Sequence, residues 1–314
     1  MSDTAAETGR VHQLITTATA LIAPTTLFTA LLFYFGYAFT KAQYAYFGLD
    51  VATIGLSTQD YVMRSPTPLV LPALILALLA AAVMAGQAAT LRRIDADPVG
   101  AAAGRWRTLS RVVLLGGVAA MSLGTVLLAV FALGALRDWA LLPLVTAALY
   151  AAGATASLVG LRFETRLGRR PPSGPTTVLP LYVVLIGGVF WAAATLAPSI
   201  GRGEARTTAR HLDQLPAVIV DTREKLYLRS PGILESRLDS ATPTKTTAAT
   251  ATNAASTAKD QTFHYRYRRL RLLIQGDNLM FLVPDTWSAS NSTLVLPIDD
   301  GSVRVQFQFQ NDPP

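Results

Sequence analysis

Long intervals without a charged residue are the feature that most constrains how this chain can fold. Five intervals in the N-terminal two thirds contain no Asp, Glu, Lys or Arg, and they hold 30, 27, 25, 23 and 31 residues. A transmembrane helix needs about 20 apolar residues to cross the ~30 Å hydrocarbon core of a bilayer. Every interval exceeds that length, so the sequence predicts a membrane bundle of five transmembrane helices. The expected spans are 14–39, 69–91, 112–136, 139–161 and 178–198.

The composition of the chain agrees with a membrane domain. Charged residues make up 15% of the 314 residues, whereas a soluble domain has about 25%. There are no cysteines, which excludes disulfides, thiolate metal ligands and a cysteine nucleophile. A secretory signal peptide is the alternative for the first span, but its apolar core would be only about 7–15 residues long. We therefore expect a membrane anchor there.

The distribution of Lys and Arg predicts the orientation. Two loops, 92–111 and 162–170, each carry a net charge of +3, whereas the alternate loops hold only one or two basic residues. The positive-inside rule places basic loops in the cytoplasm. With five spans, the N-terminal segment 1–13 would be cytoplasmic and residues 199–314 would form an extracytoplasmic domain. The expected localisation is the cell membrane, with this domain in the cell envelope.

An aromatic-rich segment follows the first predicted span. In residues 34–48, YFGYAFTKAQYAYFG, tyrosines can lie at headgroup level, because the ring is apolar while its hydroxyl bonds to water or a headgroup. The tetrapeptide STQD (57–60) then resembles a capping box that begins a short helix. We expect the outer loop 40–66 to lie on the membrane surface; a re-entrant segment or a docking surface for the outer domain is the alternative. The predicted interface anchors are Tyr34, Tyr37, Tyr44 and Tyr46.

This loop also carries a family resemblance. The segment YFGYAFTKAQYAYFGLDVATIGLSTQDYVMRSP (34–66) resembles the first outer loop of uncharacterised multi-pass membrane proteins from high-GC Gram-positive bacteria. The segment LRLLIQGDNLMFLVPDTW (270–287) resembles the C-terminal region of these proteins more loosely. The resemblance implies a helical membrane domain followed by a small outer β domain. It implies no activity.

Small residues at four-residue spacing predict how the helices pack. Inside lipid no hydrophobic force drives helices together, so they associate where small side chains let the backbones approach. Alanine is abundant in every span, and rows that contain glycine are therefore the better signal for contacts within the bundle or between copies. The expected packing residues are Gly116, Ala120, Gly124, Ala152, Ala156 and Gly160.

The C-terminal segment 199–314 has the pattern of a β domain. Residues 263–275, FHYRYRRLRLLIQ, begin with alternation of aromatic and polar residues, and a Gly-Asp-Asn turn follows at 276–278. Asp-Asp-Gly at 299–301 predicts another turn before a last strand. We expect five or six mostly antiparallel strands with one buried and one solvated face. The stretch 239–261 almost lacks bulky apolar residues, which predicts a disordered loop.

Arginines are concentrated on one predicted strand of this domain. A solvated strand face is the simplest interpretation, and contact with anionic headgroups or wall polymers is the alternative. Nucleic acid is disfavoured as a partner, because the predicted side is extracytoplasmic and the tail has a net charge of only +2. The residues that would contact an anionic partner are Arg266, Arg268, Arg269 and Arg271.

The sequence contains no recognisable catalytic, cofactor-binding or metal-binding motif. None of the three histidines belongs to a zinc or nucleophile pattern, and phosphate-binding and dinucleotide glycine motifs are missing. Asp285, Asp299 and Asp300 could bind calcium, although the last two are better explained by the turn. We therefore expect a non-enzymatic envelope sensor, binding or scaffold protein without a cofactor, surrounded by membrane lipids. The alternative is a subunit of an oligomeric transporter or channel, completed by further copies or another membrane protein.

Overall fold

Two compact units make up the chain. The helical unit comprises Met1–Ala38 and Met63–Ile200, and the β unit comprises Phe39–Val62 and Gly201–Pro314. The computed structural model describes residues 25–96, 103–134, 139–168, 174–228, 230, 232–238, 263–288, 290–298 and 301–308.

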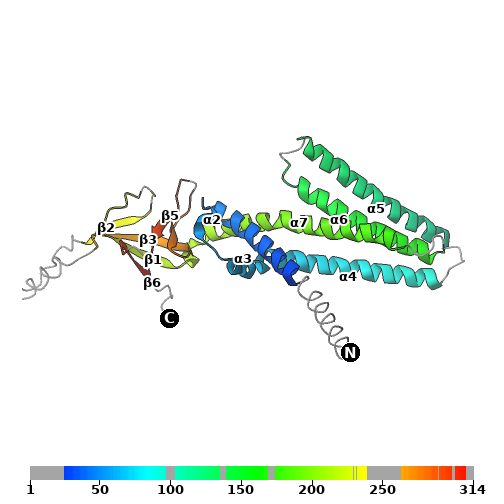
Figure 1. The fold of residues 1–314 in the computed structure, drawn as a ribbon, viewed down its shortest axis with the longest axis horizontal. Helices are drawn as coiled ribbons and strands as arrows, with labels where there is room; N and C mark the ends of the chain where they lie inside the picture. Colours follow the sequence, from blue (N-terminus) through cyan, green and yellow to red (C-terminus); the bar gives the residue numbers. More distant parts are fainter. Residues whose placement is uncertain are drawn as a thin grey trace, which may run out of the picture. The chain divides into compact units, whose positions relative to one another are not determined.

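Four long helices form most of the helical unit. They are α4 (Pro66–Ala96), α5 (Ala103–Ala132), α6 (Leu142–Arg166) and α7 (Pro175–Arg210), whose residues from Gly201 onward belong to the β unit (Figure 1). All four are long and apolar enough to cross a membrane, which confirms the predicted membrane character of the chain. The first predicted span, 14–39, begins outside the described residues, and its second half belongs to a helix over 25–45.

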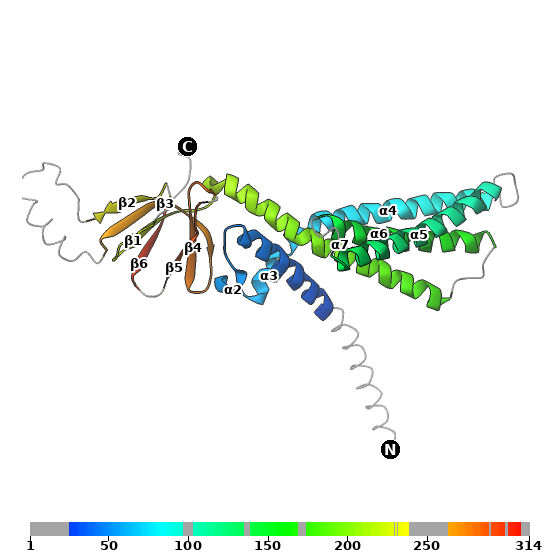
Figure 2. The same cartoon turned by 90° about the horizontal axis from the view of Figure 1, so that it is seen from above.

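The helix α7 continues well past the predicted end of its span. The expected end was 198, but α7 runs without a break through Pro198 to Arg210 (Figure 2). An ionised side chain ends a membrane span because it is costly in hydrocarbon. It does not end a helix, since charged residues have good helix propensity in water. The charge pattern therefore predicted the span and missed the rest of the helix.

The helices α5 and α6 form an antiparallel hairpin with close backbone contact (Figure 1). A Cβ added to Gly117 would stand 2.6 Å from the carbonyl oxygen of Gly153 and 2.7 Å from the amide nitrogen of Ser157. A period of seven residues is typical of left-handed helix pairs. Buried small residues recur at that period on both helices: Ser110, Gly117 and Gly124 on α5, and Thr146, Gly153 and Gly160 on α6.

The six residues predicted to pack within the bundle or between copies lie only partly at this α5–α6 contact. Gly124 and Gly160 are buried between the two helices, whereas a Cβ on Gly116 would have no atom within 4 Å. The three alanines of the predicted rows are half-buried or exposed: Ala120, Ala152 and Ala156. Since Gly116 and Gly117 are adjacent, the sequence offers two possible rows. The seven-residue period selects the row that contains Gly117.

This pair of glycines provides a matched test. Gly117→Ala should destabilise the hairpin by about 1–3 kcal/mol, because overpacking displaces the facing backbone. Gly116→Ala makes the same chemical change one residue away in open space. It should be neutral or stabilise by about 0.5–1 kcal/mol, since Ala favours a helix over Gly. Thermal unfolding of both purified variants in detergent measures the difference, and equal midpoints would contradict the contact.

The β unit contains a six-stranded antiparallel sheet, which confirms the expected β domain. Its strands are β1 (Ala217–Thr222), β2 (Leu234–Arg237), β3 (Tyr265–Gln275), β4 (Leu279–Pro284), β5 (Leu294–Pro297) and β6 (Val303–Gln308). Their order is β5-β4-β3-β1-β6, and β2 pairs with the first part of β3. The predicted turn after β3 is closed by the amide of Gly276, which donates to the carbonyl of Leu279 at 2.8 Å. Residues 299–300 and the stretch 239–261 lie outside the described residues.

Both faces of β4 are buried, so the expectation of one solvated face is wrong for this strand. On the second face, Val283 of β4 packs with Phe47 of loop 39–62 and Ala205 of α7. The short helix η1 (Leu212–Gln214) adds Leu212 to this cluster. Strand periodicity cannot reveal such a cover, because these segments are remote from β4 in sequence. The first face is buried by a cluster that includes Val218, Val220, Tyr267, Leu270, Met280, Leu282 and Leu296.

Phe47 joins loop 39–62 to the sheet. Its side chain is 2% exposed, and its ring meets the Trp287 ring edge-on with the centroids 5.1 Å apart. The hydroxyl of Thr293 donates to the Phe47 carbonyl oxygen at 2.7 Å. Ile54 ends α2 (Val51–Ile54) and lies against Gly276. A Cβ added to Gly276 would overlap the carbonyl oxygen of Ile54. The loop therefore docks on the β domain, as the alternative interpretation of this segment proposed.

The predicted capping box in this loop is present. The amide of Ser57 donates to a carboxylate oxygen of Asp60 at 2.8 Å, and the amide of Asp60 donates to the Ser57 hydroxyl at 3.2 Å. These reciprocal bonds satisfy amides that would otherwise have no partner at the start of α3 (Thr58–Arg64). α4 then begins at Pro66, because proline suits a first helical turn.

Removing the Phe47 ring should loosen the β unit. Phe47→Ala is expected to cost about 3–5 kcal/mol, because it deletes a buried aromatic ring from a packed cluster. Amides of β4 should then exchange hydrogen at least about 100-fold faster, since 1.4 kcal/mol corresponds to a factor of ten. Tyr46→Ala removes a neighbouring ring that is 39% exposed, and it should change this exchange little. Exchange mass spectrometry of the full-length protein measures both variants, and unchanged β4 exchange in Phe47→Ala would contradict the docking.

Candidate functional site

A buried carboxylate joins three strands of the β unit. Asp221 on β1 lies in register between Arg266 on β3 and Arg304 on β6. Arg266 donates from Nε and Nη2 at 2.8 and 3.0 Å, and Arg304 donates from the same atoms at 3.1 and 2.6 Å. The Asp221 side chain is inaccessible, whereas the Arg304 side chain is 48% exposed. The three groups together carry one net positive charge, part of which reaches the surface.

The environment of Asp221 keeps it ionised. Burial raises the pKa of this carboxyl, but hydrogen bonds and charges from Arg266 and Arg304 outweigh burial and hold the pKa below its usual value. Removal of the carboxylate would leave both guanidinium groups without their shared counter-charge. The arrangement therefore stabilises the pairing of β3, β1 and β6.

The four strand arginines predicted to contact an anionic partner have different surroundings. Arg266 is bonded to the carboxylate on β1, and Arg269 donates from Nε to Asp285 at 2.7 Å. Arg271 donates from Nη1 to two carbonyl oxygens at the end of η1, at 3.3 and 3.0 Å. Arg268 is exposed. Three of the four therefore serve internal contacts, and their binding to an anionic partner stays a prediction.

A β-bulge places Arg266 and Arg271 on the same face of β3, because their partners Asp221 and Ala217 lie four residues apart on β1. β1 and β3 change register between Val218 and Val220, so Arg268 and Arg269 both lie opposite Ile219. Arg269 adopts a positive φ of 65°, which is uncommon for a residue other than glycine. The extra residue interrupts the alternation of the strand. A simple two-residue period therefore misplaces the side chains that follow it.

The four tyrosines predicted as interface anchors also differ in exposure. Tyr34 and Tyr37 are exposed on the helix over 25–45, and Tyr46 is exposed in loop 39–62. Tyr44 is 5% exposed and packs inside the β unit. A role in anchoring the protein at the membrane surface stays a prediction for these residues.

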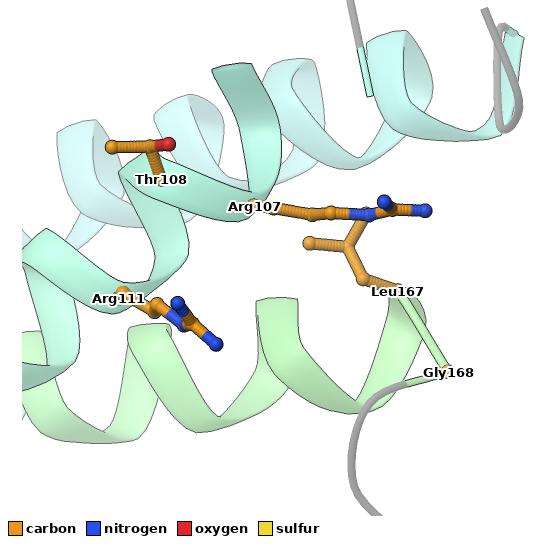
Figure 3. Close-up of a pocket in the computed structure, with 5 residues that line it drawn as sticks. All are labelled: Arg107, Thr108, Arg111, Leu167 and Gly168. Carbon is orange, nitrogen blue, oxygen red and sulfur yellow. The ribbon is translucent and has the colours of Figure 1, made fainter. Parts of the chain in front are cut away.

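A cavity of about 530 Å³ lies where α5 begins and α6 ends. Arg107, Thr108 and Arg111 of α5 line it, together with Leu167 and Gly168 at the end of α6. Figure 3 shows both arginine side chains extending toward the end of α6, while Thr108 points away from them. We call this part of the helical unit, where α4 and α6 end and α5 and α7 begin, the basic end.

A second cavity at the basic end, of about 390 Å³, lies between α4, α6 and α7. Its polar lining consists of Arg162, Thr165 and Arg166 of α6 and Tyr182 of α7, and four Leu or Val side chains complete it. Arg162 donates from Nη1 to the Gln87 side-chain oxygen at 3.0 Å and from Nη2 to the Tyr182 hydroxyl at 3.4 Å. One guanidinium thus connects three helices.

The arginines that line the two cavities of the basic end form no ion pair with the described residues, although the buried Glu164 lies between Arg162 and Arg166 on α6. Within the described part of the helical unit, no carboxylate forms an ion pair with Arg107, Arg111, Arg162 or Arg166. Arg162 uses two of its five N–H donors on neutral acceptors, which orient the group and leave its charge uncompensated. The basic end therefore offers cationic donors beside apolar helix surface.

Comparisons with known protein families, with curated proteins and with solved structures give no match for this chain. Its function must therefore be argued from the geometry. In the described ranges no group of three or more His, Asp or Glu side chains could hold a metal ion. Of the acids considered for calcium, Asp285 pairs with Arg269, and Asp299 and Asp300 lie outside the described residues.

The sequence analysis did not single out several residues that form these sites. Asp221 is the one acid in a strand of apolar and β-branched residues, and that isolation was the available signal of a buried ion pair. Arg162 was counted as part of a basic loop, although it lies one helical turn before Arg166 inside α6. Phe47 could not be distinguished from its aromatic neighbours, because its partners come from the distant tail.

The two aspartate–arginine contacts of the β unit should differ in strength. Asp221→Asn is expected to lower the free energy of unfolding by about 3 kcal/mol, because it removes the buried carboxylate that accepts hydrogen bonds from two partly exposed arginines. Asp285→Asn makes the same change in a more exposed pair and should cost less than about 1 kcal/mol. Urea unfolding followed by Trp287 fluorescence, in a background where the other three tryptophans are replaced by Phe, compares them. Equal losses near pH 7 would contradict the assignment.

The contribution of Asp221 should also depend on pH in a defined direction. Its folded-state pKa lies below the unfolded value of about 3.9. The stabilisation is therefore complete above about pH 4 and is lost as the pH falls through the lower folded-state pKa. The difference between the wild type and Asp221→Asn should shrink in that acidic range. A difference that grows on acidification would contradict the ion pair.

Proposed function

We propose that the protein is a non-enzymatic, multi-pass protein of the cell membrane that presents its β unit to the cell envelope, where this unit binds or scaffolds a partner. The observation that supports the proposal is the docking of Phe47 on β4. A loop that precedes α4 and a tail that follows α7 share one hydrophobic cluster. The β unit is thus assembled from both ends of the membrane-spanning region.

This shared cluster constrains the number of membrane crossings. Loop 39–62 and segment 201–314 can pack together only on one side of a bilayer. Between them lie four helices that are long and apolar enough to cross it. Four crossings return the chain to the side from which it started, whereas an odd number would separate Phe47 from Val283. The docking therefore supports a topology in which each of the four helices crosses once.

The charge pattern then supports an orientation. In this topology the loops 92–111 and 162–170 lie on the side opposite the β unit. Each carries a net charge of +3, and basic loops are retained in the cytoplasm. The β unit would be extracytoplasmic. With one further crossing by the predicted span 14–39, the segment 1–13 would be cytoplasmic.

Cysteine accessibility tests this topology, because the native chain has no cysteine. Ala52→Cys in α2 and Glu224→Cys after β1 place a thiol on exposed positions of the two parts of the β unit, and Gly104→Cys places one in the first turn of α5. A membrane-impermeant maleimide on intact cells should label the first two variants and not the third, which should react only after permeabilisation. Labelling of Ala52→Cys or Glu224→Cys alone would contradict the shared side. Labelling of Gly104→Cys alone would show that the orientation is the reverse of the proposed one.

A further inference from the structure

We propose that the cavity between α4, α6 and α7 binds one anionic phospholipid, with its phosphate on Arg162 and Arg166 and its acyl chains on the apolar lining. This inference goes beyond the proposed function. It depends on these helices lying in a membrane, and it is independent of the side on which the β unit lies.

The order of residues along α6 matches the order of groups in a lipid. Leu158 and Leu161 line the cavity, and Leu158 lies eight residues before Arg166, the last residue of α6. At 1.5 Å per residue, the step from Leu158 to Arg166 covers about 12 Å of the helix axis. Val178 of α7 extends the apolar lining. A lipid whose chains enter the hydrocarbon and whose headgroup stays at the interface has the same succession of apolar and charged parts.

Arg162 is held in place for an anionic ligand. Its bonds to Gln87 and Tyr182 fix the guanidinium at the cavity, but both acceptors are neutral. A charged side chain within a membrane is costly unless an opposite charge or water compensates it. Guanidinium N–H groups match phosphate oxygens in geometry and form strong charge-assisted hydrogen bonds with them. A lipid phosphate would supply the counter-charge that the described residues of this cavity lack.

The apolar lining distinguishes a lipid from a free anion. Inorganic phosphate presents the same oxygens to Arg162 and Arg166, but it gains nothing from Leu158, Leu161 or Val178. The larger cavity beside Arg107 and Arg111 has only Leu167 as an apolar side chain, so it carries no comparable argument. Basic pockets between transmembrane helices are a known arrangement for binding anionic headgroups.

Native mass spectrometry of the full-length protein in a neutral detergent tests the proposal by counting bound lipids. Dioleoylphosphatidylglycerol should bind once and at least about tenfold more tightly than dioleoylphosphatidylcholine, because the choline cation of the second lipid cancels its phosphate charge and is repelled by the two arginines. Millimolar inorganic phosphate should leave the lipid bound. Equal retention of the two lipids would overturn the proposal. Displacement of the anionic lipid by phosphate would overturn it as well, because the site would then recognise phosphate alone.

Charge-matched variants separate a specific site from general attraction to the basic end. The double variant Arg162→Gln, Arg166→Gln should weaken phosphatidylglycerol binding at least about tenfold. The control Arg92→Gln, Arg93→Gln removes the same charge from exposed positions near the end of α4 that do not line the cavity, and its affinity should stay within about threefold of the wild type. Equal losses in the two double variants would overturn the proposal.

A third variant keeps the test decisive if the first double variant does not fold. Leu158→Trp fills the part of the cavity that lies farthest from the end of α6 and leaves both arginines in place. It should weaken phosphatidylglycerol binding by about tenfold, because the acyl chains lose their contact surface. Unchanged binding in a folded Leu158→Trp protein would overturn the proposed position of the chains.

Discussion

The packing of Phe47 against the sheet is the interaction on which the rest of the structure depends. Full burial of a phenylalanine contributes about 1.5–3 kcal/mol, a large part of the stability of a small domain. The ring packs in the cluster that buries Val283 of β4. In the proposed topology, it also requires loop 39–62 and the tail to meet on one side of the membrane. One contact would then couple the folding of the β unit to the insertion of the helices that separate its two parts.

Charged side chains are compensated differently in the two units. In the β unit an inaccessible carboxylate, Asp221, is tolerated because two arginines bond to it, and the paired charges hold three strands together. At the basic end, Arg162 and Arg166 have no carboxylate partner in the described part of the chain. Such charges are tolerated where water or anionic headgroups are close. The apolar side chains of α4 are exposed, and lipid would cover them in a membrane.

The sequence predicted those parts of the fold that depend on local patterns. The long intervals without charged residues predicted the four long helices. The STQD tetrapeptide predicted the capped start of α3, and alternation with turn residues predicted an antiparallel sheet. The missed features depend on contacts between distant segments. Packing between α5 and α6 chose Gly117 over the adjacent Gly116, the cover of β4 came from loop 39–62 and α7, and a bulge at Arg269 changed the register of β3. The second cavity was missed because its residues come from three helices.

The most direct test of the central claim is a nuclear Overhauser measurement between the Phe47 ring and the Trp287 indole in the full-length protein. Selective labelling of Phe and Trp in lipid nanodiscs would isolate these signals, and Phe47→Leu would assign them. With ring centroids 5.1 Å apart, the protons lie within range of a cross-peak. The structure predicts a cross-peak that disappears in Phe47→Leu. Assigned Phe47 and Trp287 signals without a cross-peak would contradict the docking and the shared membrane side that follows from it.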